Sequence, residues 1–237
     1  IAGFKNVDAD GAPTYTFQGG EQVPGAKQPG AFTVWSSEKL MEYTGGATLP
    51  AADGDRFIIA FSAAPASSTQ EAPATDDWLI SPEIAGGSTF SFSACPFSYS
   101  YPETLRVCVS TTDDDPESFT LVEEIELAPK PNATQLEWED FSIQLPADAR
   151  YVAINYASVD QLAVMIDRIS YVPASSRIAL AGYDIYRDGM SIADKAKCDG
   201  CTFTDDNVEE NKDYSYIVVP VLANGTKGLN SNTLRIR

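Results

Sequence analysis

The sequence contains no histidine. Histidine is the most common general base near neutral pH and a frequent zinc ligand, so Ser-His-Asp and Cys-His catalysis and histidine-ligated zinc are excluded. Only three methionines and four cysteines are present. No apolar run approaches the ~18 residues of a membrane-spanning helix, so we expect no transmembrane segment. The function classes that remain are catalysis by carboxylates, binding of a hard cation, and no catalysis at all.

Basic residues are also scarce. The 237 residues include 16 Lys and Arg against 34 Asp and Glu, which gives a net charge of −18. A surface this acidic repels phosphate, so we expect no nucleic-acid partner and no electrostatic attachment to an anionic membrane. The 43% of hydrophobic residues is typical of globular proteins, and the length allows one large domain or a large and a small one.

Short alternating segments separated by turn residues fill most of the chain. In TFSFSA, residues 89–94, Phe90 and Phe92 share one face and the serines share the other. Such period-two patterning is typical of antiparallel strands. It predicts strands over residues 57–62, 78–84, 89–95, 104–111, 119–127, 136–145, 151–157 and 163–172.

Helical patterning is almost absent. One short helix is expected near residues 36–43, with Ser36 or Ser37 as its N-cap and Leu40 facing inward. Many short strands with almost no helix predict an all-β fold, a β-sandwich of the jelly-roll type.

A domain boundary is expected after residue 172, where a small, polar segment follows the last strong strand. Residues 1–172 carry 25 acidic and 8 basic residues, whereas residues 173–237 carry 9 and 8. The first part therefore has a net charge of −17 and the second of −1. We predict a jelly-roll domain over 1–172 and a small β-module over 173–237.

Five segments of the first part carry a resemblance to a known family. They are VDADG (Val7–Gly11), DDWLISPEI (Asp76–Ile84), TFSFSA (Thr89–Ala94), ETLRVCVSTTDDDPESFTLV (Glu103–Val122) and AVMIDRISYV (Ala163–Val172). In order and spacing they resemble the cleaved-adhesin and choice-of-anchor jelly-roll domains of secreted bacterial proteins, including the haemagglutinin domains of gingipain-type proteases. The resemblance implies a binding role outside the cell. Because residues 1–4 have no signal-like apolar core, we expect that any export signal has been removed.

The second part resembles the later strands of a fibronectin type III domain. LAGYDIYRDG (Leu180–Gly189), DYSYIVVPVLANG (Asp213–Gly225) and GLNSNTLRIR (Gly228–Arg237) are similar to its third, sixth and last strands, with Tyr214 at the position of the tyrosine corner. Only about 60 residues are present, whereas such sandwiches have about 100. Either this module completes its core against the jelly roll, or it is a minimal sheet of its own. We favour the first alternative, because a small sheet alone is short of core.

The aspartates are candidate ligands of a cation. Asp8 and Asp10 lie in one tight turn, Asp76 and Asp77 precede a strand, and Asp167 interrupts an apolar one. An aspartate within a buried strand is costly unless it is paired or metal-bound. The family resemblance implies a structural calcium that joins the first segment to the closing strand at these positions. The alternative is that four of them are solvated turn residues and that Asp167 pairs with a nearby arginine, Arg168 or Arg56.

Two other acidic clusters are weaker candidates for a cation site or a catalytic site. Residues 113–115, three consecutive aspartates before a proline, are interpreted as a solvated hairpin tip. Glu137 and Glu139 flank Trp138, which would suit a small glycoside hydrolase. Because alternate residues of a strand share one face, these two glutamates are more simply interpreted as a wet strand face, and we predict no enzymatic activity.

The four cysteines form two candidate pairs. Cys95 and Cys108 lie on consecutive predicted strands, and Cys198 and Cys201 form a CxxC. A redox motif needs a βαβ context, and a four-cysteine zinc site needs two close pairs, so neither is favoured. Small disulfides or reduced cysteines remain as interpretations. Of the three pairings that four cysteines allow, we favour the disulfides Cys95–Cys108 and Cys198–Cys201.

An aromatic loop is the candidate ligand site. Phe97, Tyr99 and Tyr101 fall between two predicted strands, where turn residues indicate a surface position. Exposed rings there would suit stacking on a sugar or anchoring to a protein partner, although Phe97 and Tyr101 could instead cover the edge of the core. We therefore predict a monomeric adhesin-like module that binds a glycan or an extracellular protein. The alternative is a passive spacer within a surface assembly.

Overall fold

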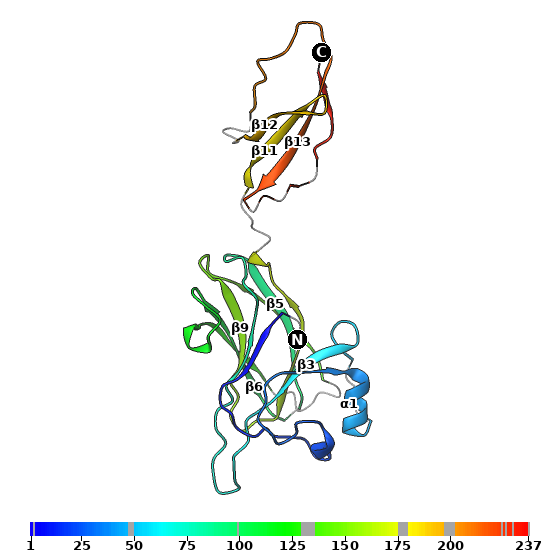
Figure 1. The fold of residues 1–237 in the computed structure, drawn as a ribbon. Helices are drawn as coiled ribbons and strands as arrows, with labels where there is room; N and C mark the ends of the chain where they lie inside the picture. Colours follow the sequence, from blue (N-terminus) through cyan, green and yellow to red (C-terminus); the bar gives the residue numbers. More distant parts are fainter. Residues whose placement is uncertain are drawn as a thin grey trace. The chain divides into compact units, whose positions relative to one another are not determined.

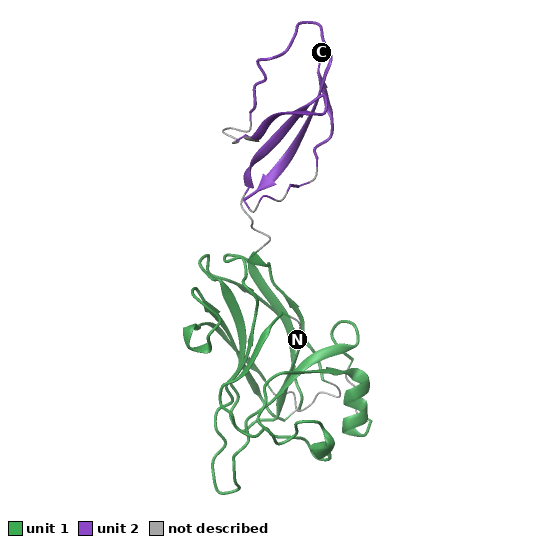
Figure 2. Cartoon of the chain, viewed as in Figure 1, with its two compact units in different colours: residues 1–174 green, residues 175–237 purple. Residues whose placement is uncertain are grey.

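The structure is a computed structural model. It describes the whole chain except residues 2, 47–49, 99, 129–135, 175–179, 197–201, 224, 226, 229 and 237. The chain divides into two compact units, Ile1–Ala174 and Ser175–Arg237 (Figure 2), and each is described by itself. The division lies two residues beyond the boundary expected from composition and charge.

Unit 1 contains two five-stranded antiparallel sheets (Figure 1). Sheet 1 has the order β1 (Lys5–Asp8), β4 (Asp77–Ile80), β9 (Tyr151–Tyr156), β6 (Glu103–Ser110), β7 (Thr120–Leu127). Sheet 2 has the order β2 (Thr33–Ser36), β3 (Arg56–Phe61), β10 (Ala163–Ser170), β5 (Thr89–Pro96), β8 (Glu139–Gln144). The predicted all-β jelly-roll sandwich is confirmed.

The main core lies between the two sheets. Phe90 and Phe92 of sheet 2 are buried there together with Val107 and Ile154 of sheet 1, which face each other across the β6–β9 pair. The alternation that predicted the strands places every second side chain in this core, because successive residues of a strand point to opposite faces.

A second, smaller core covers the outer face of sheet 2. Ile58 and Ala60 of β3 pack in the main core, whereas Phe57 and Ile59 are buried on the opposite side. The chain before and after β2 covers this side, and so does helix α1 (Ser37–Thr44). β3 is therefore buried on both faces, which explains its continuous apolar sequence.

Helix α1 forms as the sequence predicted. The Ser36 hydroxyl accepts a hydrogen bond of 3.1 Å from the backbone N–H of Lys39 and caps the helix. Leu40 is buried in the second core. Gly45 ends the helix in the left-handed conformation, at φ 72°, which glycine adopts at little cost.

The described structure does not join Cys95 and Cys108 in a disulfide, which corrects that prediction. β5 and β6 follow each other along the chain but belong to different sheets. Cys95 packs in the second core and Cys108 lies on sheet 1, where burial raises the pKa of its thiol to about 11. Cys198 and Cys201 lie outside the described residues.

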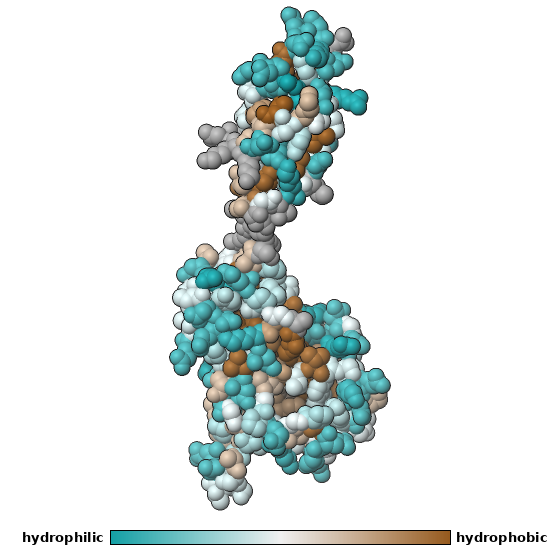
Figure 3. Space-filling view, in the orientation of Figure 1, coloured by the Kyte–Doolittle hydropathy of each residue, from teal (hydrophilic) through white to brown (hydrophobic). Residues whose placement is uncertain are grey.

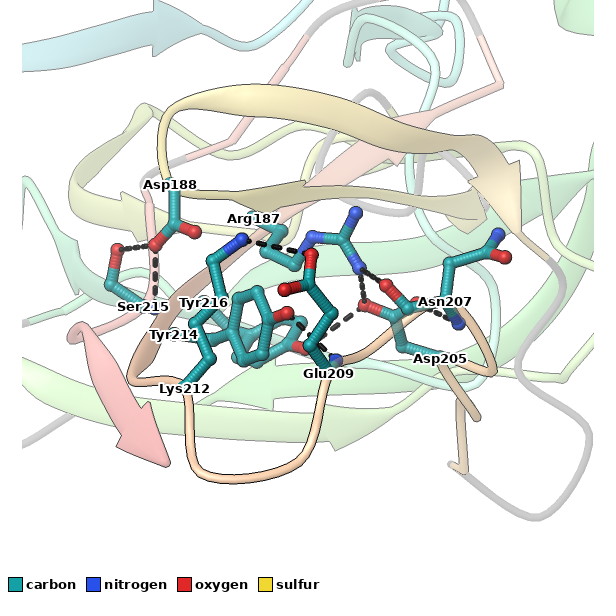
Figure 4. A network of polar contacts seen from close by, with 9 residues as sticks. All are labelled: Arg187, Asp188, Asp205, Asn207, Glu209, Lys212, Tyr214, Ser215 and Tyr216. Carbon is teal, nitrogen blue, oxygen red and sulfur yellow. Dashed lines mark hydrogen bonds and ion pairs between the residues drawn. The ribbon is translucent and has the colours of Figure 1, made fainter. Parts of the chain in front are cut away.

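Unit 2 is one four-stranded antiparallel sheet with the order β12 (Met190–Ala196), β11 (Leu180–Arg187), β13 (Tyr214–Leu222), β14 (Leu234–Ile236). The segment 202–213 is fixed to it by a polar network (Figure 4). The Arg187 guanidinium contacts the Asp205 carboxylate at 2.8 Å and donates to the Asn207 carbonyl at 2.6 Å. The Tyr214 hydroxyl accepts a hydrogen bond of 2.9 Å from the backbone N–H of Glu209, the type of contact that defines a tyrosine corner.

The visible face of unit 1 is mostly hydrophilic. Figure 3 also shows a hydrophobic area on it near the N-terminus and β3. Among the described residues, no helix is long and apolar enough to span a bilayer.

Candidate functional site

Three of the predicted aspartates meet at one end of sheet 1. In the antiparallel pairing of β1 with β4, Asp8 lies directly opposite Asp77. Asp10 follows in the turn after β1, and a carboxylate oxygen of each of the three lies within 4.8 Å of the others. The pairing of two strands thus brings together residues that are separated by almost seventy positions in the sequence.

Asp77 is the unusual member of this cluster. It is only 2% exposed, and its Oδ1 atom has no hydrogen-bond partner among the described residues. Burial, followed by the negative charges of Asp10, Asp8 and Asp76, raises the pKa of Asp77 from 3.8 to about 9. A buried carboxylate oxygen without a donor is rare, because native proteins satisfy nearly all such atoms.

The turn that carries Asp8 and Asp10 is fixed by its own hydrogen bonds. The Asp8 carboxylate accepts from the Gly11 backbone N–H at 2.7 Å. The Asp10 carboxylate accepts from the backbone N–H groups of Ala12 at 2.8 Å and Asp76 at 2.7 Å. The second of these bonds joins the turn to the start of β4, so the carboxylates are held in place before any ligand arrives.

Asp76 lies beside the cluster, but its carboxylate has other hydrogen-bond partners. Its Oδ1 atom accepts from the Trp78 indole N–H at 2.7 Å and from the Asn155 amide at 2.8 Å. Sequence reasoning did not identify Asn155. The available signal was an amide between two apolar residues of a strand, Ile154 and Tyr156, on the face opposite to the main core.

The structure does not bring Asp167 to this cluster. It lies on β10 in sheet 2, where its carboxylate accepts from the backbone N–H of Asp53 at 2.9 Å and of Arg168 at 2.7 Å. β10 shifts its register against β5 after Asp167, and Arg168 adopts a left-handed φ of 51°. An irregularity of this kind lets an acidic side chain leave an apolar strand, which the alternating pattern could not show.

The aromatic loop divides into a buried and an exposed part. The ring of Phe97 packs against Phe17 and Phe61, with ring centroids 5.4 and 6.2 Å apart, so Phe97 covers the second core. Tyr101 is 46% exposed. Tyr99 lies outside the described residues.

Trp138, the aromatic residue between the two candidate glutamates, is part of the second core. Its indole N–H donates to the Pro50 carbonyl at 3.0 Å, and its ring lies 6.1 Å from that of Phe57. A tryptophan that covers a core edge does not offer its face to a sugar between Glu137 and Glu139. The arrangement thus gives the hydrolase hypothesis no support.

The aspartates at 113–115 organise a turn. The Asp115 carboxylate caps a single 3-10 turn by accepting from the Glu117 backbone N–H at 3.2 Å. Asp113 accepts from the Asp115 N–H at 3.1 Å, and hydrogen bonds from Ser118 and Asp115 lower its pKa. Asp114 pairs with Lys5 at 3.1 Å. These contacts agree with the interpretation as a hairpin tip.

Comparison with known proteins gives one family and one fold. A family model described as Cleaved Adhesin Domain matches residues 35–171, more than half of the chain. The K1 cleaved adhesin domain of Lys-gingipain from Porphyromonas gingivalis W83 is 21% identical, with a TM-score of 0.51 over 71% of this chain and 89% of that domain. The K2 domain of Lys-gingipain is 19% identical, with a TM-score of 0.52 over 72% and 89%. No curated protein sequence matches. At these identities the two structures show the fold alone.

Proposed function

The chain belongs to the Cleaved Adhesin Domain family, and from this premise we propose that it is a non-catalytic binding module that recognises a glycan or an extracellular protein. Its place of action is then the cell exterior or the cell surface. The family and the adhesin-type sandwich of unit 1 support this role. The acidic composition supports it as well, because a net charge of −18 leaves neutral or basic partners rather than nucleic acid.

The binding proposal rests on the exposed side chain of Tyr101. The loop between β5 and β6 is anchored at its start by Phe97, which packs in the second core, and Tyr101 at its end is 46% exposed. An exposed ring on an anchored loop loses little conformational freedom on binding. Tyrosine rings stack on the apolar face of a sugar and also fill pockets of protein partners.

The cation proposal is that Asp8, Asp10 and Asp77 hold a structural calcium ion. Carboxylate oxygens are the ligands that calcium prefers, and the unpartnered Oδ1 atom of Asp77 is the observation that fits an ion there. When bound, the ion would supply positive charge to three crowded carboxylates. The chain's own contribution is to hold the Asp8–Asp10 turn against the start of β4, through the bond from the Asp76 N–H to Asp10.

The experiment for the binding proposal is a screen of the full chain, in calcium, against a broad glycan panel and a set of extracellular matrix proteins. We expect at least one specific ligand, and Tyr101→Ala should weaken its binding. Leu121→Ala is the matched control, because Leu121 is 55% exposed but lies on β7. Binding to neither panel would contradict the proposal and favour the spacer role. Equal binding by the wild type and Tyr101→Ala would show that Tyr101 is not part of the ligand site.

A further inference from the structure

Unit 1 contains a cavity of about 410 Å³ between the loop that follows β1, strand β2 and helix α1. In Figure 1 the segment that follows β1, drawn in blue, reaches the side of the unit where α1 lies. The cavity lining includes Tyr15, Gln28, Trp35, Lys39, Tyr43 and Phe61. The volume is within the usual range of small-ligand sites, roughly 300–1,000 Å³.

The walls of the cavity are held in place by contacts within the chain. The backbone N–H of Thr14 donates to the Gln28 carbonyl at 3.3 Å and joins the two ends of the loop. The Tyr15 hydroxyl donates to Asp160 at 2.5 Å, and Val23 at the middle of the loop is buried in the second core. A loop that is tied at its ends and anchored at its middle is preorganised, which lowers the entropic cost of binding.

The floor of the cavity is aromatic. The Trp35 ring lies edge-to-face with Tyr43 at a centroid distance of 5.2 Å, and 5.8 Å from Phe61. Gln28 is an exposed residue of the lining, and its carboxamide offers two N–H donors and a carbonyl acceptor. Aromatic rings beside an exposed carboxamide match a ligand that has one apolar face and a polar edge.

The charge around the cavity is unusual for this chain. Among the described residues that line it, none is acidic and only Lys39 is charged, although the chain has 34 acidic residues. The Lys39 ammonium forms an ion pair of 2.7 Å with Glu42, and both side chains are half-exposed. The pair cancels the lysine charge locally. A cation would find no carboxylate in this wall, and the net charge of −18 opposes an anion.

We propose that this cavity is a binding site for one neutral pyranose ring, with the ring face on the aromatic floor and its hydroxyl groups toward Gln28. This inference rests on the proposed binding role and specifies a ligand class, an uncharged sugar, and a position apart from Tyr101. Neutral sugars have the required combination of an apolar face and hydrogen-bonding edges.

The test uses the full chain and a panel of neutral monosaccharides, namely glucose, galactose, mannose and N-acetylglucosamine, with binding measured by saturation-transfer NMR. Gln28→Ala should weaken binding of the preferred sugar about tenfold, the expected loss for one or two hydrogen bonds. Gly30→Tyr should abolish binding, because Gly30 lines the cavity and a Cβ added there meets no atom within 4 Å. Unchanged melting temperatures would show that both variants fold.

The outcomes separate this inference from the proposed function. Weaker sugar binding in Gln28→Ala and its loss in Gly30→Tyr, with retention in Tyr101→Ala, support the cavity site. If none of the four sugars binds, or if both cavity variants bind like the wild type, the inference is wrong. If a glycan or protein found in the screen depends on Tyr101 while both cavity variants bind it normally, the cavity inference fails and the proposed function stands. Binding of galacturonate more tightly than galactose would contradict the neutral class.

Discussion

Asp8 lies directly opposite Asp77 in the pairing of β1 with β4, and the carboxylates of both approach that of Asp10 within 4.8 Å. Like charges at this separation repel each other, and the burial of Asp77 strengthens the repulsion because water is excluded. Folding must therefore bring one of these carboxylates to a proton or to a cation.

Calcium should stabilise unit 1. A ligand present at about one hundred times its dissociation constant adds roughly 2.7 kcal/mol to the free energy of unfolding. We expect a clear rise in melting temperature when calcium replaces a chelator, measured by calorimetry. Asp77→Asn and Asp10→Asn should remove most of the calcium-dependent rise, because each removes one charged ligand.

Asp167→Asn is the matched control for the calcium experiment. It makes the same chemical change on sheet 2, where Asp167 accepts from the backbone of Asp53 and Arg168. The variant can lower the melting temperature with and without calcium, but the difference between the two conditions should remain. An equal loss of that difference in Asp167→Asn and Asp77→Asn would argue against the three-aspartate site.

Glu103 should make the stability of unit 1 depend on pH. It is fully buried on β6, and burial raises the pKa of its carboxyl above 4.5, partly offset by hydrogen bonds from Tyr156, Ser158 and the backbone of Leu162 and Ala163. The folded state therefore binds this proton more tightly than the unfolded state does. Its contribution to stability is complete below pH 4.5 and falls as the pH rises toward the raised value.

Glu103→Gln tests this origin of the pH dependence. Glutamine does not titrate, so this part of the pH dependence should disappear in denaturant titrations at a series of pH values. The amide nitrogen cannot accept a hydrogen bond, whereas both Glu103 oxygens do: Tyr156 and Ser158 donate to one, and the backbone N–H groups of Leu162 and Ala163 donate to the other. Near neutral pH the variant should lose about 1–3 kcal/mol, the cost of leaving a buried donor unpaired. An unchanged pH profile would exclude Glu103 as its source.

Cys95 and Cys108 should both be thiols in the folded protein. Alkylation of the denatured chain without a reductant, followed by mass spectrometry, should label both residues. In the native protein Cys108 should react slowly, because burial raises its pKa to about 11 and little thiolate forms at neutral pH. Recovery of a peptide that links Cys95 to Cys108 would restore the disulfide that the sequence predicted.

The sequence predicted the elements that have strong internal patterns. Phe90 and Phe92 identify β5, and Ser36 and Leu40 identify α1. The four-residue strand β1 was missed because KNVD has almost no alternation and becomes a strand only through its pairing with β4. Local pattern cannot show pairing between distant segments.

The candidate sites also divide into residues that local sequence pattern identified and residues that only the tertiary structure brings together. The sequence drew attention to Asp8, Asp10 and Asp77, because acidic residues before and after strands are visible in it. The family resemblance placed Asp167 with them, and the sequence AVMIDRIS has no clear pattern that would show the bulge in β10. The cavity on the outer face of sheet 2 was not predicted at all. Its wall joins residues before β2 to residues of α1 and β3, and only the tertiary structure brings these together.

Tyr214 should fix the segment 202–213 to the sheet of unit 2. Its hydroxyl accepts from the Glu209 N–H at 2.9 Å, and the residue is 8% exposed. Tyr214→Phe removes the acceptor, keeps the ring and should destabilise unit 2 by about 1 kcal/mol. Amide hydrogen exchange should detect this as faster exchange of the Glu209 N–H, with unchanged exchange in β5 and β9 of unit 1.

Tyr186→Phe is the matched control, because the Tyr186 hydroxyl contacts Lys227 at 3.2 Å rather than the segment 202–213. Equal protection of Glu209 in wild type and Tyr214→Phe would show that the contacts of Arg187 with Asp205 and Asn207 are sufficient to hold the segment.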